Sequence, residues 1–576
     1  MDNEIIKSEP EFLAYCDEIK EQRVLAISIA ATGEDPRLDQ LRILSIAWEN
    51  FAISIDCRKL LPGGRSLLKS VLESSGVKIF HEAGRALQFL VAAEIFPKVL
   101  FDTALAARLL LIDKLKDFSF GTLSDYYLRE EFCETLSFEN QDNKLSLEEI
   151  NHCRARAKLL LRLRKAQISE LKAKALTQTA KIEFDCAIAT AQMEYHGVFL
   201  DLASWHKLSE KYVREKDAAI NELYKFSGTP AVQTALWGED FAVDVNFESN
   251  DYVLSLLRKY EIPAKSTSKQ ALAPYREHPL VKAISRYRTS SKLLSSFLYP
   301  LPEAIHKASG RLHPHYEQIA AWSGRMSCYA PNIQQIPRNK EFRSCFAAPE
   351  GRVLLLADYS QIELRVVAQI TKDERMLKAY RSGEDLHSHT ASIILNKPIE
   401  LISSAERQYA KAVNFGLIYA MGAEGLRLSA QQSYGVEMSY EQAQEFRKRF
   451  FAAYPAVKSW HNALERTKNF AGQTLAGRKF SFTKWHGLPV HSNAPVQGSA
   501  ADILKRALGN LAIKLSETSA FIVATIHDEI IVECPEKEAE RYKTLLKTVM
   551  EEAADSILKD VPTGVDVTVA KRWSEK

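Results

Sequence analysis

The chain has 576 residues, of which 46% are apolar and 26% are charged, and its formal net charge is +3. The length predicts several domains, and the composition is that of an ordinary globular protein. So small a net charge does not by itself indicate a nucleic-acid-binding protein, although clustered positive charge could still form such a surface.

The cysteines and the N-terminus exclude several classes of protein. The eight cysteines are scattered, with no pair spaced as zinc ligands and no pattern of a disulfide framework. The N-terminus is acidic and lacks the basic and apolar regions of a signal peptide, and no apolar run approaches the roughly 20 residues that span a membrane. We therefore expect a reduced, cytoplasmic protein that does not contact a membrane.

The first third of the chain alternates apolar runs with turn residues. Residues 24–30, 43–48 and 51–55 are predicted strands, and residues 64–74 and 83–93 are predicted helices. Strands mixed with helices indicate an α/β domain.

A basic helix is predicted at residues 145–176. Its six cations either form a solvated face or contact nucleic-acid phosphates. They are Arg154, Arg156, Lys158, Arg162, Arg164 and Lys165.

The order of these elements resembles the 3′→5′ exonuclease domain that often precedes a polymerase. The matching landmarks lie at residues 27–33 (Ile-Ser-Ile-Ala-Ala-Thr-Gly), 79–82 and 101–103. The chemistry of that family needs four carboxylates around two metal ions. The corresponding positions here carry Ser28, Ala30, Ala86 and Arg156.

A site without carboxylates cannot hold two hard cations, and Arg156 would add repulsion. Asp102 remains, but one acid beside an apolar run is more typical of a structural role. We therefore expect residues 1–178 to form a folded, RNase H-like exonuclease-type domain without exonuclease activity.

The middle of the chain is mainly helical. The pattern over residues 182–224 is interrupted at Gly197, which fits a helix stop, and helices return at residues 252–260 and 280–298. The last helix mixes cations with serines. It either grips a duplex backbone or belongs to an ordinary amphipathic bundle.

Two loop motifs follow. Residues 322–327 (Trp-Ser-Gly-Arg-Met-Ser) place a glycine beside Arg325, which allows close backbone approach. Residues 331–337 contain Asn332 and Gln334, whose amides can donate and accept hydrogen bonds at base edges in a minor groove. Taken alone, such residues are also frequent in loops.

A short apolar run at residues 353–357 ends in Asp358, which is typical of a buried strand that presents a carboxylate at its tip. Asp358 alone could equally cap a helix predicted at residues 361–368. A second acid decides between these interpretations. Asp528 lies at the tip of a predicted β-hairpin, where buried acids are costly unless a positive charge is present. Asp358 and Asp528 together predict a site for two Mg²⁺ ions.

A nucleotide-binding helix is predicted between these two acids. Ser403 and Glu406 form a capping-box pattern, so a helix should begin there. One face of it carries, at every fourth position, Arg407, Lys411, Phe415 and Tyr419. Cations near a helix N-terminus favour a polyphosphate, and the aromatic residues further along could stack on a sugar or base.

Together these motifs resemble the family A DNA polymerases, the bacterial DNA polymerase I family. The resemblance is strong over about residues 180–576 and weak before them. It rests on residues 358–365 (Asp-Tyr-Ser-Gln-Ile-Glu-Leu-Arg), on the Arg407–Tyr419 helix and on His527-Asp-Glu529. Residues 323–325 and 493–502 look like two further elements of the family.

The resemblance implies a multidomain α/β and α+β protein in which a right-hand polymerase domain, residues 179–576, follows the exonuclease-like domain. The thumb would span about residues 185–300, the palm about 301–370 and 490–576, and the fingers about 371–489. We expect a short form of the family, without a 5′-nuclease domain.

The resemblance also implies a role for each matching residue. Two Mg²⁺ ions, for which Mn²⁺ may substitute in the family, would be held by Asp358, the Tyr359 carbonyl and Asp528, with Glu529 as a further catalytic residue. The nucleotide would be bound by Arg407, Lys411, Phe415, Tyr419, His387, Gln361 and Glu363. The primer–template would be contacted by Arg325, Asn332, Gln334, Asn493, Gln497 and His527.

Within the nucleotide set, Arg407, Lys411 and His387 would touch the phosphates, and Lys411 would protonate the leaving pyrophosphate. Glu363 and Phe415 would crowd the ribose 2′ position and exclude ribonucleotides. Tyr419 would occupy the template-base position before closure.

The sequence departs from the family pattern at two positions. Ala420 follows Tyr419 where the family usually has glycine, and an alanine there should stiffen the helix end. Pro489 stands roughly where a basic residue often precedes the Asn493 helix. Phe415, where some members carry tyrosine, predicts discrimination against dideoxynucleotides.

We predict a template-directed DNA polymerase that adds dNTPs to a primer 3′-hydroxyl without proofreading. It is expected to act as a monomer in the cytoplasm of a bacterial or phage-infected cell, and an organelle is the alternative location. One alternative is a single-subunit RNA polymerase, against which a 2′ filter at Glu363 argues. The other is a non-catalytic DNA-binding accessory protein, against which the complete set of acids and cations argues.

Overall fold

The computed structural model describes residues 5–133, 145–228, 232–234, 240–242, 245–468 and 471–576. The chain divides into two compact units. The first contains residues 1–197, 313–334 and 350–570, and the second contains residues 198–312, 335–349 and 571–576. Each unit therefore combines segments that lie far apart in the sequence.

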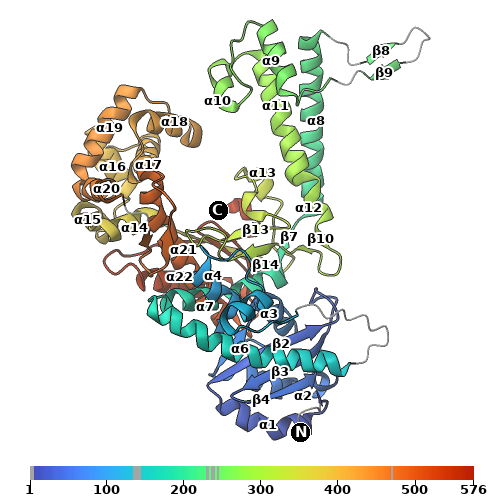
Figure 1. The fold of residues 1–576 in the computed structure, drawn as a ribbon. Coiled ribbons are helices and arrows are strands. Elements are labelled where there is room, and N and C mark those ends of the chain that lie inside the picture. The colour runs from blue at the N-terminus through green and yellow to red at the C-terminus, as the bar shows by residue number, and fades with distance from the viewer. Residues whose placement is uncertain (1–4, 134–144, 229–231, 235–239, 243–244, 469–470) are drawn as a thin grey trace. The chain divides into compact units, whose positions relative to one another are not determined.

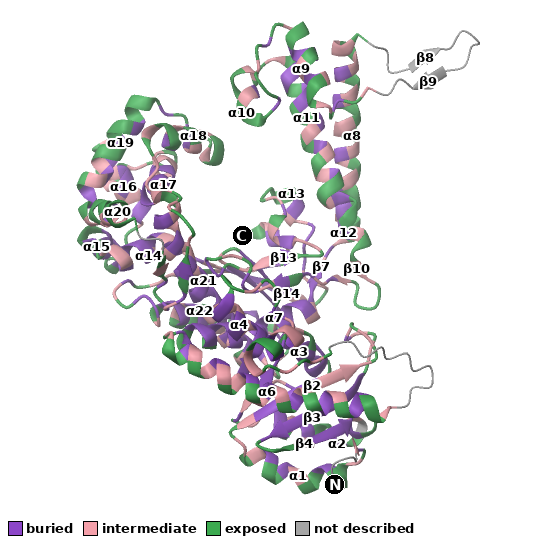
Figure 2. Ribbon diagram, viewed as in Figure 1, coloured by how far each residue is buried: buried purple, intermediate pink, exposed green. Residues whose placement is uncertain are grey.

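A six-stranded mixed sheet organises the start of the first unit (Figure 1). Its order is β1 (Ile5–Ile6), β4 (Phe51–Asp56), β3 (Leu41–Trp48), β2 (Val24–Ala31), β5 (Val77–Phe80) and β6 (Leu100–Asp102). The strands β2, β3 and β4 pair antiparallel, whereas β5 and β6 run parallel to β2. All eight residues of β3 are buried (Figure 2), as expected for a central strand with apolar side chains on both faces. The three predicted strands are confirmed.

Helices surround this sheet. They are α1 (Glu9–Glu21), α2 (Cys57–Leu72), α3 (Ala83–Ala92), α4 (Thr103–Leu111), α5 (Phe120–Leu128) and α6 (Leu147–Ala173). Both predicted helices in this region and the basic helix are confirmed. The helix α6 begins with a capping box between Ser146 and Glu149.

The basic residues of α6 do not all face solvent. Arg154 is buried, and Arg156 and Arg164 lie over the rings of Phe120 and Phe101, at 4.9 and 5.5 Å from the ring centroids. These contacts are cation–π interactions, which hold the helix against the domain. The interpretation of the six cations as one solvated face is therefore wrong for half of them. The remaining three, Lys158, Arg162 and Lys165, are exposed.

A four-stranded antiparallel sheet forms the centre of the rest of this unit. Its order is β17 (Phe521–Ile526), β18 (Glu529–Pro535), β14 (Arg352–Tyr359) and β19 (Val565–Ala570). The helices α7 (Thr177–His196), α21 (Leu488–Leu515) and α22 (Ala539–Asp555) pack with it. Burial of the apolar residues Val353 to Ala357 makes β14 a core strand, as its sequence predicts.

In the described part of the chain, seven α-helices lie between β14 and β15. They are α14 (Ile362–Thr371), α15 (Glu374–Arg381), α16 (Leu386–Leu395), α17 (Ser404–Ile418), α18 (Ala423–Tyr434), α19 (Tyr440–Ala453) and α20 (Pro455–Thr467). A hairpin of β15 (Ala471–Gln473) and β16 (Lys479–Ser481) then leads to α21. The helix α17 packs against α14, α16, α18 and α19, so it lies at the centre of this group.

The second unit is built on two long helices that pack side by side, α8 (Leu202–Ser227) and α11 (Pro279–Leu293) (Figure 1). Gly197, with φ +63°, ends α7 before this unit begins, as the sequence predicts. The base of α8 is fixed by Trp205, which is fully buried and packs against the rings of Phe342 and Phe346. Arg572, near the C-terminus, pairs with Asp201, the N-cap of α8, at 2.8 Å.

A buried network of charges joins α7, α21 and the β15–β16 hairpin. The Arg478 guanidinium contacts the carboxylates of both Glu183 and Asp502, and Lys505 Nζ lies 2.6 Å from Glu183 Oε1. All four side chains are at most 3% exposed. Burial raises the pKa of Glu183, but Lys505 and Arg478 lower it by more, so the carboxylate stays ionised. The network thus holds α21 by paired charges.

Removing one carboxylate from this network should be costly. Glu183→Ala leaves two buried cations with only Asp502, and we expect the free energy of unfolding to fall by about 3–5 kcal/mol. Urea denaturation measures this loss. The matched control is Glu445→Ala, which removes the exposed pair to Arg449 on α19 and should cost about 1 kcal/mol or less. Equal losses in the two variants would contradict a stabilising role for the buried network.

Candidate active site

The pairing of β14 with β18 brings the predicted acids together. Asp358 lies directly opposite Glu529 in the antiparallel register, and Asp528 precedes Glu529 in the turn that joins β17 to β18. Glu529 is only 4% exposed, whereas Asp358 and Asp528 are half-buried. His527, with φ +60°, forms the tip of this hairpin. Two partly accessible carboxylates, Asp358 and Asp528, therefore lie at the same end of the neighbouring strands β14 and β18.

The capping interpretation of Asp358 is wrong. The residue belongs to β14, and the next helix, α14, begins at Ile362 with Gln361 at its N-cap position. Gln361 has φ +56° and makes no side-chain cap. Its amide instead donates to Asp385 over 2.6 Å. Asp358 is therefore not the N-cap residue of α14.

The helix predicted to bind a nucleotide begins as its sequence indicates. Ser403 caps α17, and Ser403 and Glu406 form a full capping box, which confirms the predicted start. Arg407 lies in the first turn and forms a two-pronged ion pair with Asp385, at 2.8 and 2.9 Å. Lys411 and Phe415 are half-buried on the turns that follow.

Sequence reasoning missed the role of Asp385. This carboxylate caps α16 through Ser388 N and binds both Gln361 and Arg407. Burial raises the pKa of Asp385, but Arg407 and Ser388 lower it by more, so its pKa lies far below the ordinary value. The spacing of Asp385 and Ser388 signals a helix cap, but nothing in the sequence signals the pair with Arg407.

His387, two residues after Asp385 on α16, is buried. It is 2% exposed, its Nδ1 lies 2.9 Å from Asn414 Nδ2, and its ring packs obliquely against Phe415 with centroids 5.9 Å apart. Burial lowers its pKa to about 4, so the imidazole is neutral at pH 7. His387, on α16, is therefore buried against Asn414 and Phe415 of α17.

Glu363 joins the helix α17 to the loop of Arg325. One carboxylate oxygen accepts a hydrogen bond from the Tyr419 hydroxyl, and the other lies 2.8 Å from Arg325 Nη2. Glu363 thus contacts both Tyr419 and Arg325, which come from two other segments of the chain. The residue after Tyr419, Ala420, has φ +57°, a left-handed conformation that favours glycine. The departure from the family's glycine therefore falls at a strained position.

The expected DNA-binding residues gather near the same point. A side chain at Gly324, where φ is +74°, would collide with Arg478. One at Gly498 would lie 3.2 Å from the Ser323 carbonyl oxygen, so α21 packs directly against this loop one residue after Gln497. The helix α21 also carries Asn493.

Gln334 lies on a different segment. Its amide donates to the Thr525 carbonyl of β17 over 3.2 Å, which places it beside the strand that leads to His527. Asn332 lies at the start of the same turn and is half-buried. Both residues of the second loop motif are thus held against the hairpin that carries the acids.

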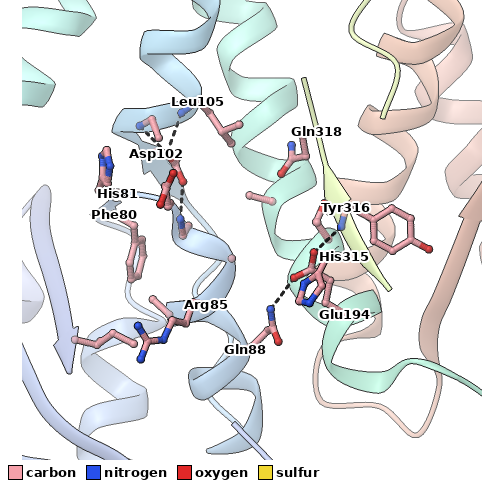
Figure 3. A pocket seen from close by; sticks show the side chains of 18 of the residues that line it. Phe80, His81, Arg85, Gln88, Asp102, Leu105, Glu194, His315, Tyr316 and Gln318 are labelled. Atoms are coloured by element: carbon pink, nitrogen blue, oxygen red, sulfur yellow. Dashed lines mark hydrogen bonds between the residues drawn. The ribbon is translucent and has the colours of Figure 1, made fainter. Parts of the chain in front are cut away.

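A separate cavity of about 1010 Å³ is lined by residues of the six-stranded sheet and its helices, of α7 and of β12 (His315–Glu317) (Figure 3). Three of the four positions that would carry exonuclease carboxylates, Ser28, Ala86 and Arg156, line this cavity. The fourth, Ala30, lies on β2. Three of the four positions therefore lie around one cavity.

The remaining acid of the exonuclease-like motifs has a structural role, as predicted. Asp102 is 2% exposed and accepts hydrogen bonds from the amides of Ala104 and Leu105, which caps α4 (Figure 3). It also accepts from Ala83 N over 2.7 Å. Burial raises the pKa of Asp102, although these backbone donors oppose that shift. Its oxygens are therefore already used.

Across the described ranges, no group of three or more His, Cys, Asp or Glu side chains is arranged to hold a metal ion. No helix in the described part of the chain is both long and apolar enough to span a membrane.

Comparisons with known proteins agree with this architecture. The model of the family described as DNA polymerase family A matches residues 240–575. A DNA polymerase I from Aquifex aeolicus is 32% identical over 603 aligned residues, which cover 100% of both chains. The family is thereby decided.

The chain belongs to DNA polymerase family A. It is a DNA-directed DNA polymerase, and members of this family depend on divalent metal ions. The sequence-based prediction of template-directed DNA synthesis is confirmed over the two alternatives, the RNA polymerase and the non-catalytic accessory protein.

Two further relatives define the extent of the similarity. The thermostable DNA polymerase I of Thermus filiformis is 35% identical over 448 residues, which cover 73% of this chain but 51% of that protein. The solved structure of the polymerase domain of Pol1 from M. smegmatis, in complex with primer–template DNA and dNTP, has a TM-score of 0.78 at 25% identity and covers 97% of each chain. The polymerase thus spans about half of the Thermus protein.

The cavity wall contains a carboxyl group that should titrate near neutrality. Glu194 is 8% exposed and accepts hydrogen bonds from Gln88 Nε2 and Tyr316 N, at 2.7 and 2.8 Å (Figure 3). Burial raises its pKa from 4.5 to about 7, against the opposing effects of Tyr316 N and the Arg37 cation.

Because the folded protein binds this proton more tightly than the unfolded chain, the free energy of unfolding should fall as the pH rises from about 4.5 to about 7. The Glu194 contribution to this loss is up to about 3 kcal/mol. Urea titrations at pH 5 and pH 8 measure it, and Glu194→Gln should reduce the difference by that amount. The control is Glu21→Gln, at an exposed position on α1. An unchanged pH dependence in Glu194→Gln would contradict the assignment.

Proposed function

We propose that this polymerase joins a dNTP to the primer 3′-hydroxyl at the end of the β17–β18–β14–β19 sheet that carries Asp358 and Asp528. The observation that carries the proposal is the register that sets Asp358 opposite Glu529, the residue that follows Asp528 in the hairpin. The nucleotide-binding helix α17 reaches the same region through the contact of Tyr419 with Glu363, which follows Asp358 by five residues.

The donor set fits two Mg²⁺ ions. Mg²⁺ prefers hard oxygen ligands and is commonly bound through one or two carboxylates, with substrate phosphates completing the shell. Asp358, Asp528 and the Tyr359 carbonyl would supply the protein ligands, and the dNTP would supply the rest. When bound, such ions lower the pKa of the attacking hydroxyl and neutralise charge on the leaving phosphates. Glu529, which is almost fully buried, would support the hairpin and orient Asp528.

The dNTP would lie along the face of α17. Arg407 would exchange its pair with Asp385 for a phosphate, because its guanidinium is partly exposed and a polyphosphate offers more negative charge. Lys411, one turn further, would bind the same phosphates and supply the proton to pyrophosphate. Glu363 and Phe415 would exclude a ribose 2′-hydroxyl. His387 is buried, so we assign it the support of Phe415 in addition to the predicted contact with phosphate.

The primer–template is the proposed partner, as in the M. smegmatis complex. Six residues would contact it: Arg325, Asn332, Gln334, Asn493, Gln497 and His527. Their positions around the loop at Gly324, the helix α21 and the acid-bearing hairpin support this assignment. Tyr419 would hold the template-base position until Glu363 releases it. We propose that the enzyme acts as a monomer.

We further propose that residues 1–178 form an RNase H-like exonuclease-type domain that no longer cleaves DNA. The support is that Ser28, Ala86 and Arg156 line the cavity where carboxylates would be needed, while Asp102 is fully engaged as a helix cap. The polymerase domain would then span residues 179–576. Its thumb would be built on α8 and α11, its palm on the four-stranded sheet, and its fingers on α14 to α20.

Loss of one metal-binding carboxylate should abolish synthesis. We expect Asp528→Asn to lower the primer-extension rate by on the order of a thousandfold or more, because the substitution removes several kcal/mol of charge stabilisation. Primer–template binding, measured by fluorescence anisotropy, should remain. The matched control is Asp566→Asn, which removes an exposed carboxylate of the same sheet from the other neighbour of Asp358. Normal extension by Asp528→Asn would overturn the site assignment.

The absence of proofreading is tested with a primer that carries a mismatched, labelled 3′ nucleotide. With Mg²⁺ or Mn²⁺ and no dNTP, the purified enzyme should release no labelled nucleotide, since the four positions expected to carry the metal-binding carboxylates hold Ser28, Ala30, Ala86 and Arg156. A pyrophosphate-free reaction excludes reversal of synthesis. Release that persists in Asp528→Asn would show a working exonuclease site and contradict the proposal.

A further inference from the structure

An aromatic cluster that none of the proposed roles uses lies beside the Arg325 loop. The centroids of Trp322 and Phe482 are 5.2 Å apart, and those of Phe482 and His491 are 4.8 Å apart. Trp485 stacks on His491 with centroids 4.0 Å apart and an angle of 15° between the rings. We name Trp322, Phe482 and Trp485 the aromatic platform. His491 is buried beneath it.

The platform is accessible and positively flanked. Trp322 is 39% exposed, and Phe482 and Trp485 are half-buried. Lys479 and Lys484 lie on either side of Phe482 in the sequence, and both are exposed. Neither lysine forms an ion pair within the part of the chain that the structure describes. Aromatic rings that are at least partly exposed and lie among cations are typical of surfaces that bind single-stranded nucleic acid.

The platform lies next to the proposed DNA-binding residues. Trp322 precedes Arg325 by three residues, and its loop packs against α21 at Gly498. His491, which supports Trp485, lies on α21 two residues before Asn493. The rings therefore continue the surface that Arg325, Asn493 and Gln497 would offer to the primer–template.

We infer that the aromatic platform stacks on unpaired bases of the single-stranded template. This inference rests on the proposed function. Within a duplex, neighbouring base pairs already cover each base, so only unpaired bases present a free face. Stacking is tolerant of sequence because every base has such a face, which suits an enzyme that must copy any template. Lys479 and Lys484 would bind the phosphates between the stacked bases.

The test compares three labelled primer–templates by fluorescence anisotropy with the full chain and no dNTP. The first has a six-nucleotide 5′ template overhang, the second has the same overhang built from abasic nucleotides, and the third has a one-nucleotide overhang. We expect the full chain to bind the first at least about fivefold more tightly than the second, in line with the stacking of one base or more. Equal affinity for these two substrates would overturn the inference without any variant.

Variants of the platform then test whether its rings are the side chains that stack on the template bases. Trp322→Ala and Trp485→Ala should lose the preference for bases over abasic nucleotides, while binding of the one-nucleotide overhang changes less than about twofold. Tyr440→Ala, which removes an exposed ring from α19, should keep the preference. Because Trp485 packs on a buried ring, Trp322→Ala provides the test should Trp485→Ala fail to fold. A uniform loss on all three substrates would show that the cluster only stabilises its loop, and would overturn the inference.

Failure of the inference is distinct from failure of the proposed function. If the wild-type chain extends primers but binds base-containing and abasic overhangs equally, the stacking is absent and the active-site assignment stands. If Asp528→Asn extends primers normally, the active-site assignment falls whatever the overhang preference.

Discussion

The antiparallel pairing of β14 with β18 is the constraint on which the site depends. A shift of this register by one residue would turn every side chain to the opposite face and separate Asp358 from the acids of the hairpin. The run from Val353 to Ala357 is buried on both faces of β14, and the partly exposed Arg352 and Asp358 bound it at its two ends. Burial of the valines and leucines of these strands holds the acidic residues near one another. The free energy of that burial offsets the electrostatic repulsion between the carboxylates.

A second layer of positioning comes from the buried charges of Glu183, Arg478, Asp502 and Lys505. These side chains tie α21 to α7 and to the β15–β16 hairpin, and Arg478 also limits the space at Gly324. The loop of Arg325 is therefore fixed against the helix that carries Asn493 and Gln497. Apolar residues could fill the same volume, but they would not set the relative position of three segments by directional contacts.

Local signals made the elements of this site predictable, and long-range pairs were beyond reach. The capping box of Ser403 and Glu406 and the apolar run before Asp358 lie within single segments, so their structures follow from the sequence around them. The pair of Arg407 with Asp385 depends on how α16 packs against α17, and Glu183 meets Arg478 across 295 residues. Neither carries a sequence signal of its own, since an isolated acid or cation is most often on the surface.

The part of the chain built on the six-stranded sheet makes three sets of polar contacts with α7 and β12. Its Arg37 donates to the carbonyls of Glu194 and Tyr195 at the C-terminus of α7, its Gln88 bonds Glu194, and its Arg108 pairs with Glu317 of β12. None of these contacts needs a metal-binding carboxylate. This part of the chain can therefore support α7, on which β17 packs, whether or not it binds metal ions.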